Sequence, residues 1–174
     1  MATTEPASAI VVRIPVPHAI ERARRRWDPG ARAGVPAHVT ILFPFLPAGR
    51  LGPGIRRALA TIAVAHEPFD VRFARAGRFT DVVYLAPEPS APFVRLTEAV
   101  VARFPAYPPY EGAFDEVIPH LTVADSHDAP LDEMATQARA ELPFDHRVAA
   151  LEVIVEGGDG RWRTRWRLPL GVRP

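Results

Sequence analysis

One order of sequence elements occurs twice in this chain. Each copy begins with an apolar run that carries His-x-Thr: His38-Val39-Thr40 in the first and His120-Leu121-Thr122 in the second. A turn, a helix-like segment and a strand-like segment that starts with Pro-Phe-Asp follow in both copies, and a further strand pattern closes each. Such an internal repeat indicates duplicated units, so we expect the two His-x-Thr strands to be equivalent about a pseudo-twofold axis.

The spacing within each His-x-Thr motif determines where its side chains point. Residues 37–46 and 117–124 both read as buried strands, and the apolar run of the first suits a strand buried on both faces. Because successive side chains of a strand alternate between its faces, the His and Thr of each motif point the same way. We therefore expect two histidines and two threonines to face one another across the axis.

The remaining patterns predict an α+β fold. Helices are expected at 18–27, 54–66, 90–104 and 131–142, with Ser90 as a helix cap. Strands are expected at 9–16, 71–79, 82–86, 148–155 and 161–170, and loops at 28–36 and 105–119. With 174 residues, 48% of them apolar, we expect a single domain over 1–174. It should consist of two intimately packed lobes, each a mostly antiparallel sheet with helices outside.

Composition excludes several classes of function. The chain has no cysteine, which excludes disulfides, thiol catalysis and thiolate metal sites, and its net charge of +1 gives no overall attraction for polyanions. No apolar run reaches membrane-spanning length and residues 1–8 lack a signal-peptide pattern, so a cytoplasmic protein without membrane contact is expected. All 21 basic residues are Arg, so the choice of Arg over Lys carries no information at any position.

Two imidazoles that face one cleft can act as a general acid and general base pair on a phosphodiester. One takes the proton of the attacking water or hydroxyl, and the other protonates the leaving oxygen. The hydroxyls of Thr40 and Thr122 can donate to the non-bridging oxygens as negative charge develops there. This chemistry needs neither a metal nor an organic cofactor.

Three stretches carry a resemblance to a known family: His38 to Phe43, Val83 to Pro89, and Pro108-Pro109-Tyr110 with Pro119 to Ala124. Over nearly its whole length the chain resembles the two-histidine (2H) phosphoesterase superfamily, the LigT-like group that includes 2′-5′ RNA ligases and cyclic nucleotide phosphodiesterases. The resemblance implies a bilobal, pseudo-symmetric fold with a concave cleft, and metal-independent opening of 2′,3′-cyclic phosphates or related esters. It also implies that His38 and His120 are catalytic and that Thr40 and Thr122 bind phosphate.

The chain departs from this family after the second motif. Bacterial RNA-ligase-like relatives often have a basic residue there, whereas this chain has Asp125. Seven acidic residues and no Arg lie between positions 111 and 133, namely Glu111, Asp115, Glu116, Asp125, Asp128, Asp132 and Glu133. This surface would repel a long RNA, so a nucleotide cyclic phosphate or a short RNA is the expected partner. The same charges favour a protonated His120, which makes it the candidate general acid.

Other residues have two readings each. Arg13 is a candidate phosphate ligand or a partner in a salt bridge at the strand edge. Tyr84 and Tyr110 are candidate substrate-binding aromatics, or they pack in the core and in the loop. The alternation of Arg161, Arg163, Arg165 and Arg167 with bulky residues indicates a phosphate-binding face, or an outer strand kept soluble by its charge.

The remaining basic groups favour structural interpretations. The four arginines at 22 and 24–26 are expected on a solvated helix face. His18, His66, His127 and His146 have no repeated counterpart, and we expect them to be structural or surface residues.

Three functional hypotheses follow. The first is a metal-independent phosphoesterase that acts on 2′,3′-cyclic phosphates or 2′-5′ linked nucleotides, with no obligate protein partner. The second is a non-catalytic module that binds a nucleotide or RNA end in the same cleft. The third is a metal hydrolase built on His38 and His120, although no carboxylate stands at supporting spacing in both repeats.

Overall fold

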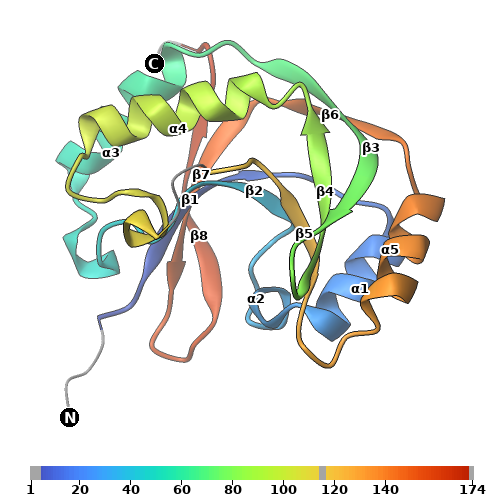
Figure 1. The fold of residues 1–174 in the computed structure, drawn as a ribbon. Helices are drawn as coiled ribbons and strands as arrows, with labels where there is room; N and C mark the ends of the chain where they lie inside the picture. Colours follow the sequence, from blue (N-terminus) through green and yellow to red (C-terminus); the bar gives the residue numbers. More distant parts are fainter. Residues whose placement is uncertain (1–4, 114–116, 173–174) are drawn as a thin grey trace.

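The computed structural model describes residues 5–113 and 117–172, which form two four-stranded antiparallel sheets (Figure 1). The first sheet has the order β2 (His38–Leu42), β1 (Ser8–Arg13), β7 (Ala150–Glu156), β8 (Trp162–Pro169). The second has the order β5 (Leu121–Asp125), β4 (Val82–Glu88), β3 (Phe69–Arg78), β6 (Phe144–Val148). The two motif strands, β2 and β5, are thus edge strands of different sheets.

The helices of the described residues divide between the two sheets. They are α1 (His18–Trp27), α2 (Pro29–Arg32), α3 (Pro53–Val64), α4 (Ala91–Arg103) and α5 (Leu131–Ala140), with short 3-10 helices at Ala48–Arg50 and Pro109–Gly112. α3 and α4 pack on strands of the first sheet, whereas α1 and α5 pack on strands of the second (Figure 1). The predicted α+β fold with two antiparallel sheets is confirmed.

The chain crosses repeatedly between the two lobes. α1 precedes β2 in sequence, with the short α2 between them, but packs against β5; α4 precedes β5, with the 3-10 helix Pro109–Gly112 between them, but packs against β2. Each motif strand is therefore held in place by the helix that leads into the other motif. This exchange couples the positions of the two motifs, because neither lobe is built from one continuous half of the chain.

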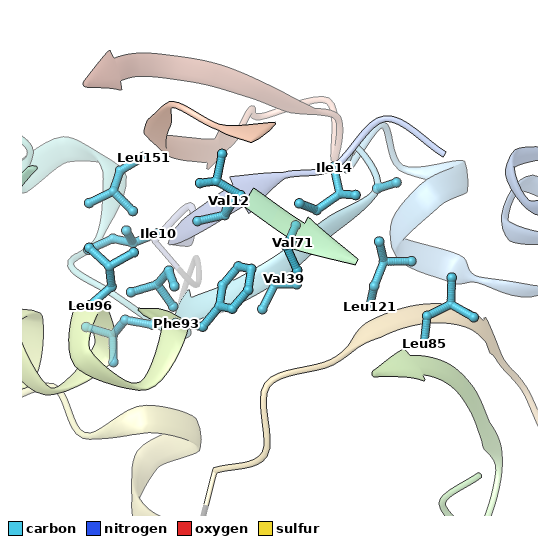
Figure 2. Packing of buried hydrophobic residues seen from close by; sticks show 14 of the residues in the cluster. Ile10, Val12, Ile14, Val39, Val71, Leu85, Phe93, Leu96, Leu121 and Leu151 are labelled. Atoms are coloured by element: carbon cyan, nitrogen blue, oxygen red, sulfur yellow. The ribbon is translucent and has the colours of Figure 1, made fainter. Parts of the chain in front are cut away.

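The alternation of side chains in β1 explains how one face of the first sheet is left for a site. Ile10 and Val12 of β1, and Ile14 just beyond it, belong to the main core, whereas Val11 and Arg13 lie on the opposite face. The core continues into the second sheet without a break. Figure 2 shows Val12 and Val39 of the first sheet in the same cluster as Val71, Leu85 and Leu121 of the second. Truncating one of these buried aliphatic side chains to Ala would cost about 2–5 kcal/mol.

Two details of the strands differ from prediction. Only residues 38–42 of the predicted strand 37–46 are extended, and this edge strand is buried on one face while the face of His38 and Thr40 is half-buried. In β8 the register shifts so that Ile154 pairs with Thr164 and Val153 with Trp166. The shift leaves Arg165 out of register and sends Trp162 and Trp166 to opposite faces. The predicted arginine face, with all bulky residues on the other side, is therefore wrong.

The loop predicted at 28–36 also contains a helical turn, α2. Asp28 caps this turn, because its Oδ1 accepts a hydrogen bond from the N–H of Gly30 at 2.8 Å. Ser90 stands at the cap position of α4 as predicted, but its side chain makes no capping hydrogen bond.

Candidate active site

The two motif histidines occupy equivalent places at the junction between the sheets. His38 is the first residue of β2 and His120 directly precedes β5. β2 and β5 are in contact although they belong to different sheets, and Figure 1 shows them side by side. Burial is the main cause that lowers the pKa of His38, and the positive charge of His120 adds to it, so the two rings lie within electrostatic range of each other.

Matching hydrogen bonds fix the orientation of both imidazole rings. His38 Nδ1 lies 2.7 Å from the carbonyl oxygen of Pro36, and His120 Nδ1 lies 2.7 Å from that of Ile118. A carbonyl can only accept, so each Nδ1 carries the proton and donates it. The Nε2 atom of each ring is therefore the atom left for chemistry.

Burial keeps His38 neutral. Loss of solvent around the ring lowers its pKa from 6.5 to about 4, and the positive charges of Arg24 and His120 act in the same direction. The hydrogen bond to Pro36 and the charge of Asp28 oppose this shift. At neutral pH the Nε2 atom of His38 is consequently unprotonated, which is what a general base requires.

A short chain of hydroxyl groups leads to this Nε2 atom. Thr40 Oγ1 lies 3.1 Å from His38 Nε2, and the Tyr110 side chain is hydrogen-bonded to Thr40. Burial raises the pKa of the Tyr110 hydroxyl, an effect that the bond to Thr40 partly offsets, so Tyr110 stays protonated at neutral pH. Tyr110 was predicted either to bind substrate or to pack in its loop. In the structure it lies beside the first motif.

The second motif is flanked by aromatic rings. The ring of Tyr84 lies 5.8 Å from that of His120 in an edge-on arrangement, and β4 brings Tyr84 into register with Thr122. Phe79 stacks on Tyr84 at 4.3 Å and lies 5.3 Å from His120. Phe79 is 39% exposed, so the outer ring of this aromatic stack is Phe79 rather than Tyr84.

Gly77 makes room for the aromatic stack. It pairs with Tyr84 across β3 and β4, and a Cβ atom at this position would overlap with the Tyr84 ring. The sequence patterns singled out neither Gly77 nor Phe79. A glycine within a strand pattern was the available indication, since such glycines often mark a close approach.

Arg13 is next to His38, but its side chain is bound to other residues of the protein. Its backbone pairs with that of His38, and its side chain forms an ion pair with Glu152 at 3.2 Å and donates to Thr164 Oγ1 at 3.2 Å. The salt-bridge reading of Arg13 therefore describes its guanidinium in this structure. The group still lies half exposed on the face that carries His38.

Arg24 was predicted on a solvated helix face, and that prediction is wrong. Its side chain is only 1% exposed. It donates to the carbonyl oxygens of Thr122 (3.2 Å) and Val35 (3.3 Å), and it forms ion pairs with Glu21 (3.0 Å) and Asp28 (3.3 Å). One buried guanidinium thus holds the backbone of the second motif and the segment that leads into the first.

The helical spacing of α1 contained this information. Arg24 stands four residues after Ile20, which is buried, and so lies on the apolar stripe of the helix. Its two carboxylate partners stand three residues before and four residues after it. A charged residue on such a stripe has to be paired, because burial of an unpaired charge costs several kcal/mol, about 3–5 when one partner is removed.

Carboxylates gather on the side of His120. Burial raises the pKa of Asp125, with the negative charges of Asp28 and Asp81 acting in the same direction, while His127 and His120 lower it. Asp81 in turn forms an ion pair with His127 at 3.1 Å. Of the seven acidic residues predicted beside the second motif, Asp125 belongs to this group, to which the structure adds Asp81; Asp115 and Glu116 lie outside the described residues.

The other histidines lie outside the two motifs. His66 Nδ1 bonds to the carbonyl of Ile62, His127 pairs with Asp81, His146 is half-buried in β6, and His18 is exposed at the start of α1. Within residues 5–113 and 117–172, no group of three or more His, Cys, Asp or Glu side chains is arranged to hold a metal ion. In the same residues, no helix combines the length and apolar character needed to cross a bilayer.

A sequence profile described as the 2′-5′ RNA ligase superfamily matches residues 12–160, a span that includes both motifs, Tyr84, Tyr110 and Arg24. The chain belongs to this superfamily. Membership accords with the resemblance to LigT-like 2H phosphoesterases noted from the motifs.

Several solved structures share the fold. TT0787 of Thermus thermophilus is 18% identical with a TM-score of 0.63, over 97% of this chain and all of that one. E. coli LigT in apo form is 18% identical with a TM-score of 0.53, over 95% and 99% of the two chains. E. coli LigT complexed with 3′-AMP is 17% identical with a TM-score of 0.56, over 97% and 100%. No curated protein matches the sequence.

Proposed function

We propose that this superfamily member is a phosphoesterase that opens 2′,3′-cyclic phosphates or cleaves 2′-5′ linked nucleotides, with His38 as general base and His120 as general acid. The observation that carries the proposal is the matched pair of imidazoles, each with Nδ1 bonded to the carbonyl two residues earlier. E. coli LigT, which shares the fold, has been solved with 3′-AMP, and this supports a nucleotide as the ligand.

The reaction can be written with two proton transfers. His38 Nε2 takes a proton from water as the water oxygen forms a bond to phosphorus. The bond between phosphorus and one ring oxygen of the cyclic phosphate breaks, and His120, in its doubly protonated form, gives its Nε2 proton to that oxygen. The products are a phosphomonoester and a hydroxyl, and a later proton exchange with water restores both rings.

Asymmetric surroundings support this assignment of roles. His38 has a pKa of about 4 and is neutral near pH 7, whereas Asp125 lies close enough to His120 for its carboxylate to attract the imidazolium. Thr40 and Thr122 would donate to the non-bridging oxygens as their charge grows. The Tyr110 hydroxyl would restrain Thr40, and the stack of Phe79 on Tyr84 would receive a base against the exposed Phe79 ring.

The test is a screen of nucleoside 2′,3′-cyclic phosphates and short 2′-5′ and 3′-5′ oligonucleotides in excess chelator, with wild type beside His38→Ala and His120→Ala. His18→Ala is the matched control, because His18 is exposed at the start of α1. Turnover by wild type and by the control is expected, with turnover about 10²–10⁴-fold slower in both motif variants. Turnover that disappears in chelator and returns with added metal would overturn the proposal in favour of a metal hydrolase.

A second candidate is a module that binds a nucleotide or RNA end without turning it over. The carboxylates around His120 favour it, because they oppose the approach of an anionic substrate to the proposed acid. Binding without hydrolysis across the whole panel would support this candidate against the first.

A further inference from the structure

A cavity lined by arginines lies beside the segment that leads into His38. It has a volume of about 740 Å³ and lies between the end of β1, α1, the segment at 31–37 and the residue that precedes β8. Its charged lining residues are Arg13, Arg25, Arg32, Arg161 and Glu21. We refer to it as the arginine cavity. Its volume falls in the range of ligand sites, which is roughly 300–1,000 Å³.

The arginine cavity carries an excess of positive charge. Arg13 is paired with Glu152 and Arg25 with Glu21, which it shares with the buried Arg24. Arg32 and Arg161 form no ion pair with a carboxylate of the described residues. Arg32 Nη1 donates to the carbonyl of Arg26 at 2.8 Å and Arg161 Nη1 to the carbonyl of Arg32 at 3.2 Å. These backbone bonds orient both guanidiniums without neutralising them, and each keeps further N–H groups for a ligand.

The cavity shares a wall with the first motif. Pro36, whose carbonyl accepts the proton of His38 Nδ1, lines the cavity, and so does Ala37. Arg13 lines it as well and pairs with His38 across β1 and β2. The cavity and the first motif are therefore neighbours, joined by Arg13, Pro36 and Ala37.

The surroundings of the two histidines differ in the sign of their charge. Unpaired guanidiniums lie beyond His38, whereas the carboxylates of Asp81 and Asp125 lie beside His120. The Nδ1 hydrogen bonds of the two rings match, so the charge beyond each ring is a difference that an elongated anion would meet. Such a ligand should extend from the histidines toward the arginine cavity and away from Asp125.

We propose that the arginine cavity binds a second phosphate of the substrate, the next phosphodiester of a short oligonucleotide whose reacting phosphate lies between His38 and His120. The proposal rests on the proposed function for the location of the reacting phosphate. It makes a short oligonucleotide, rather than a lone nucleoside cyclic phosphate, the preferred substrate class. Two unpaired guanidiniums suit a phosphate, which arginine can contact through two parallel hydrogen bonds.

The test compares substrates of different length in a double variant, Arg32→Gln/Arg161→Gln. The matched control is Arg50→Gln/Arg139→Gln, which removes the same charge from two exposed arginines that line no described cavity beside the motifs. Binding of a trinucleotide with a 3′-terminal phosphate is measured at several salt concentrations, and KM is measured for the cyclic-phosphate trinucleotide and for a nucleoside 2′,3′-cyclic phosphate. A nucleoside 5′-triphosphate provides a further binding arm.

The double variant should bind the trinucleotide about tenfold more weakly. The slope of log K against log salt should become shallower by about 0.7 for each phosphate that the variant no longer neutralises. KM for the nucleoside cyclic phosphate should not change, and the control should behave as wild type. Equal weakening of both substrates, or unchanged trinucleotide binding, would overturn the proposal. Loss of triphosphate binding with trinucleotide binding intact would overturn the assignment to an oligonucleotide.

These results can be separated from the fate of the proposed function. Trinucleotide binding needs no turnover, so arginine-dependent binding without hydrolysis of any substrate would refute only the proposed phosphoesterase activity. Conversely, hydrolysis that depends on both histidines but shows no arginine-dependent preference for length would refute only the role of the cavity.

Discussion

The ionisation of His38 yields a prediction that requires no knowledge of the substrate. Burial lowers its pKa from 6.5 to about 4 in the folded protein, whereas an unfolded chain keeps the value near 6.5. Between these two values the unfolded chain binds a proton that the folded protein does not. Stability contributed by neutral His38 is therefore fully present above about pH 6.5 and is lost as the pH falls toward 4.

The size of the effect follows from the same two values. At about pH 4.5 the unfolded chain is almost fully protonated at this residue and the folded protein only in part, which corresponds to a loss of about 2.5 kcal/mol relative to about pH 7.5. A His38→Gln variant lacks the titrating group but leaves the other five histidines in place. The difference in unfolding free energy between wild type and variant should thus change by about 2.5 kcal/mol across this interval.

Two measurements check the prediction. Urea unfolding of wild type and His38→Gln at both pH values gives the free-energy difference, and an NMR titration of the imidazole nitrogens gives the pKa and the tautomer directly. The His38 signals, assigned by their absence from the variant, should show a protonated Nδ1 and an unprotonated Nε2 down to about pH 4. A His38 ring that titrates near pH 6.5, with a difference between the proteins that does not depend on pH, would refute the reasoning.

Three further predictions concern other parts of the site. Arg24→Met leaves two carboxylates and two carbonyls without their donor, so it should destabilise the protein by about 3–5 kcal/mol in urea unfolding. Arg25→Met is the control, because the exposed Arg25 guanidinium shares Glu21, and it should cost under about 1 kcal/mol. Equal losses would contradict the bridging role of Arg24. Gly77→Ala should displace Tyr84 and raise KM about tenfold with kcat retained. Gly49→Ala, at a position with open space around it, should change neither KM nor kcat. An unchanged KM in Gly77→Ala would show that the aromatic stack binds no base. In steady-state kinetics, the pH profile of kcat/KM for the wild type should have its acid-side limb near pH 4. This limb should disappear in His38→Ala and persist in His120→Ala. The reverse pattern would exchange the roles of acid and base.

Local sequence patterns predicted the helices and strands well because residues with strong positional preferences stand at the ends of these elements. The helix expected at 18–27 occurs with those bounds, and the hairpin expected about residues 80–81 joins β3 to β4. Proline just before or at the start of α1, α3 and α4 is one physical reason, since it is compatible with a first helical turn and not with a helix interior. The alternation rule also placed the His and Thr of each motif on one face.

Long-range contacts were beyond these patterns. No local sequence pattern predicts that α1 packs on β5, so the contact of Arg24 with the Thr122 carbonyl could not be derived from the sequence. The pairing of Gly77 with Tyr84 depends on the register of β3 against β4, and the gathering of Arg13, Arg32 and Arg161 depends on three separate segments. The arginine pattern of β8 failed for the same reason, because a single shift in register at Arg165 changes which face each following side chain takes.

The central claim is that His38 and His120 act on a single phosphate, and a crystal structure with a bound nucleoside 2′-monophosphate, grown in excess chelator, tests it most directly. We predict that the Nε2 atoms of both rings lie within about 3.2 Å of oxygens on one phosphorus, with the Thr40 and Thr122 hydroxyls on the remaining oxygens. A phosphate that contacts only one of the two rings, or that binds in the arginine cavity with the histidines vacant, would contradict the account.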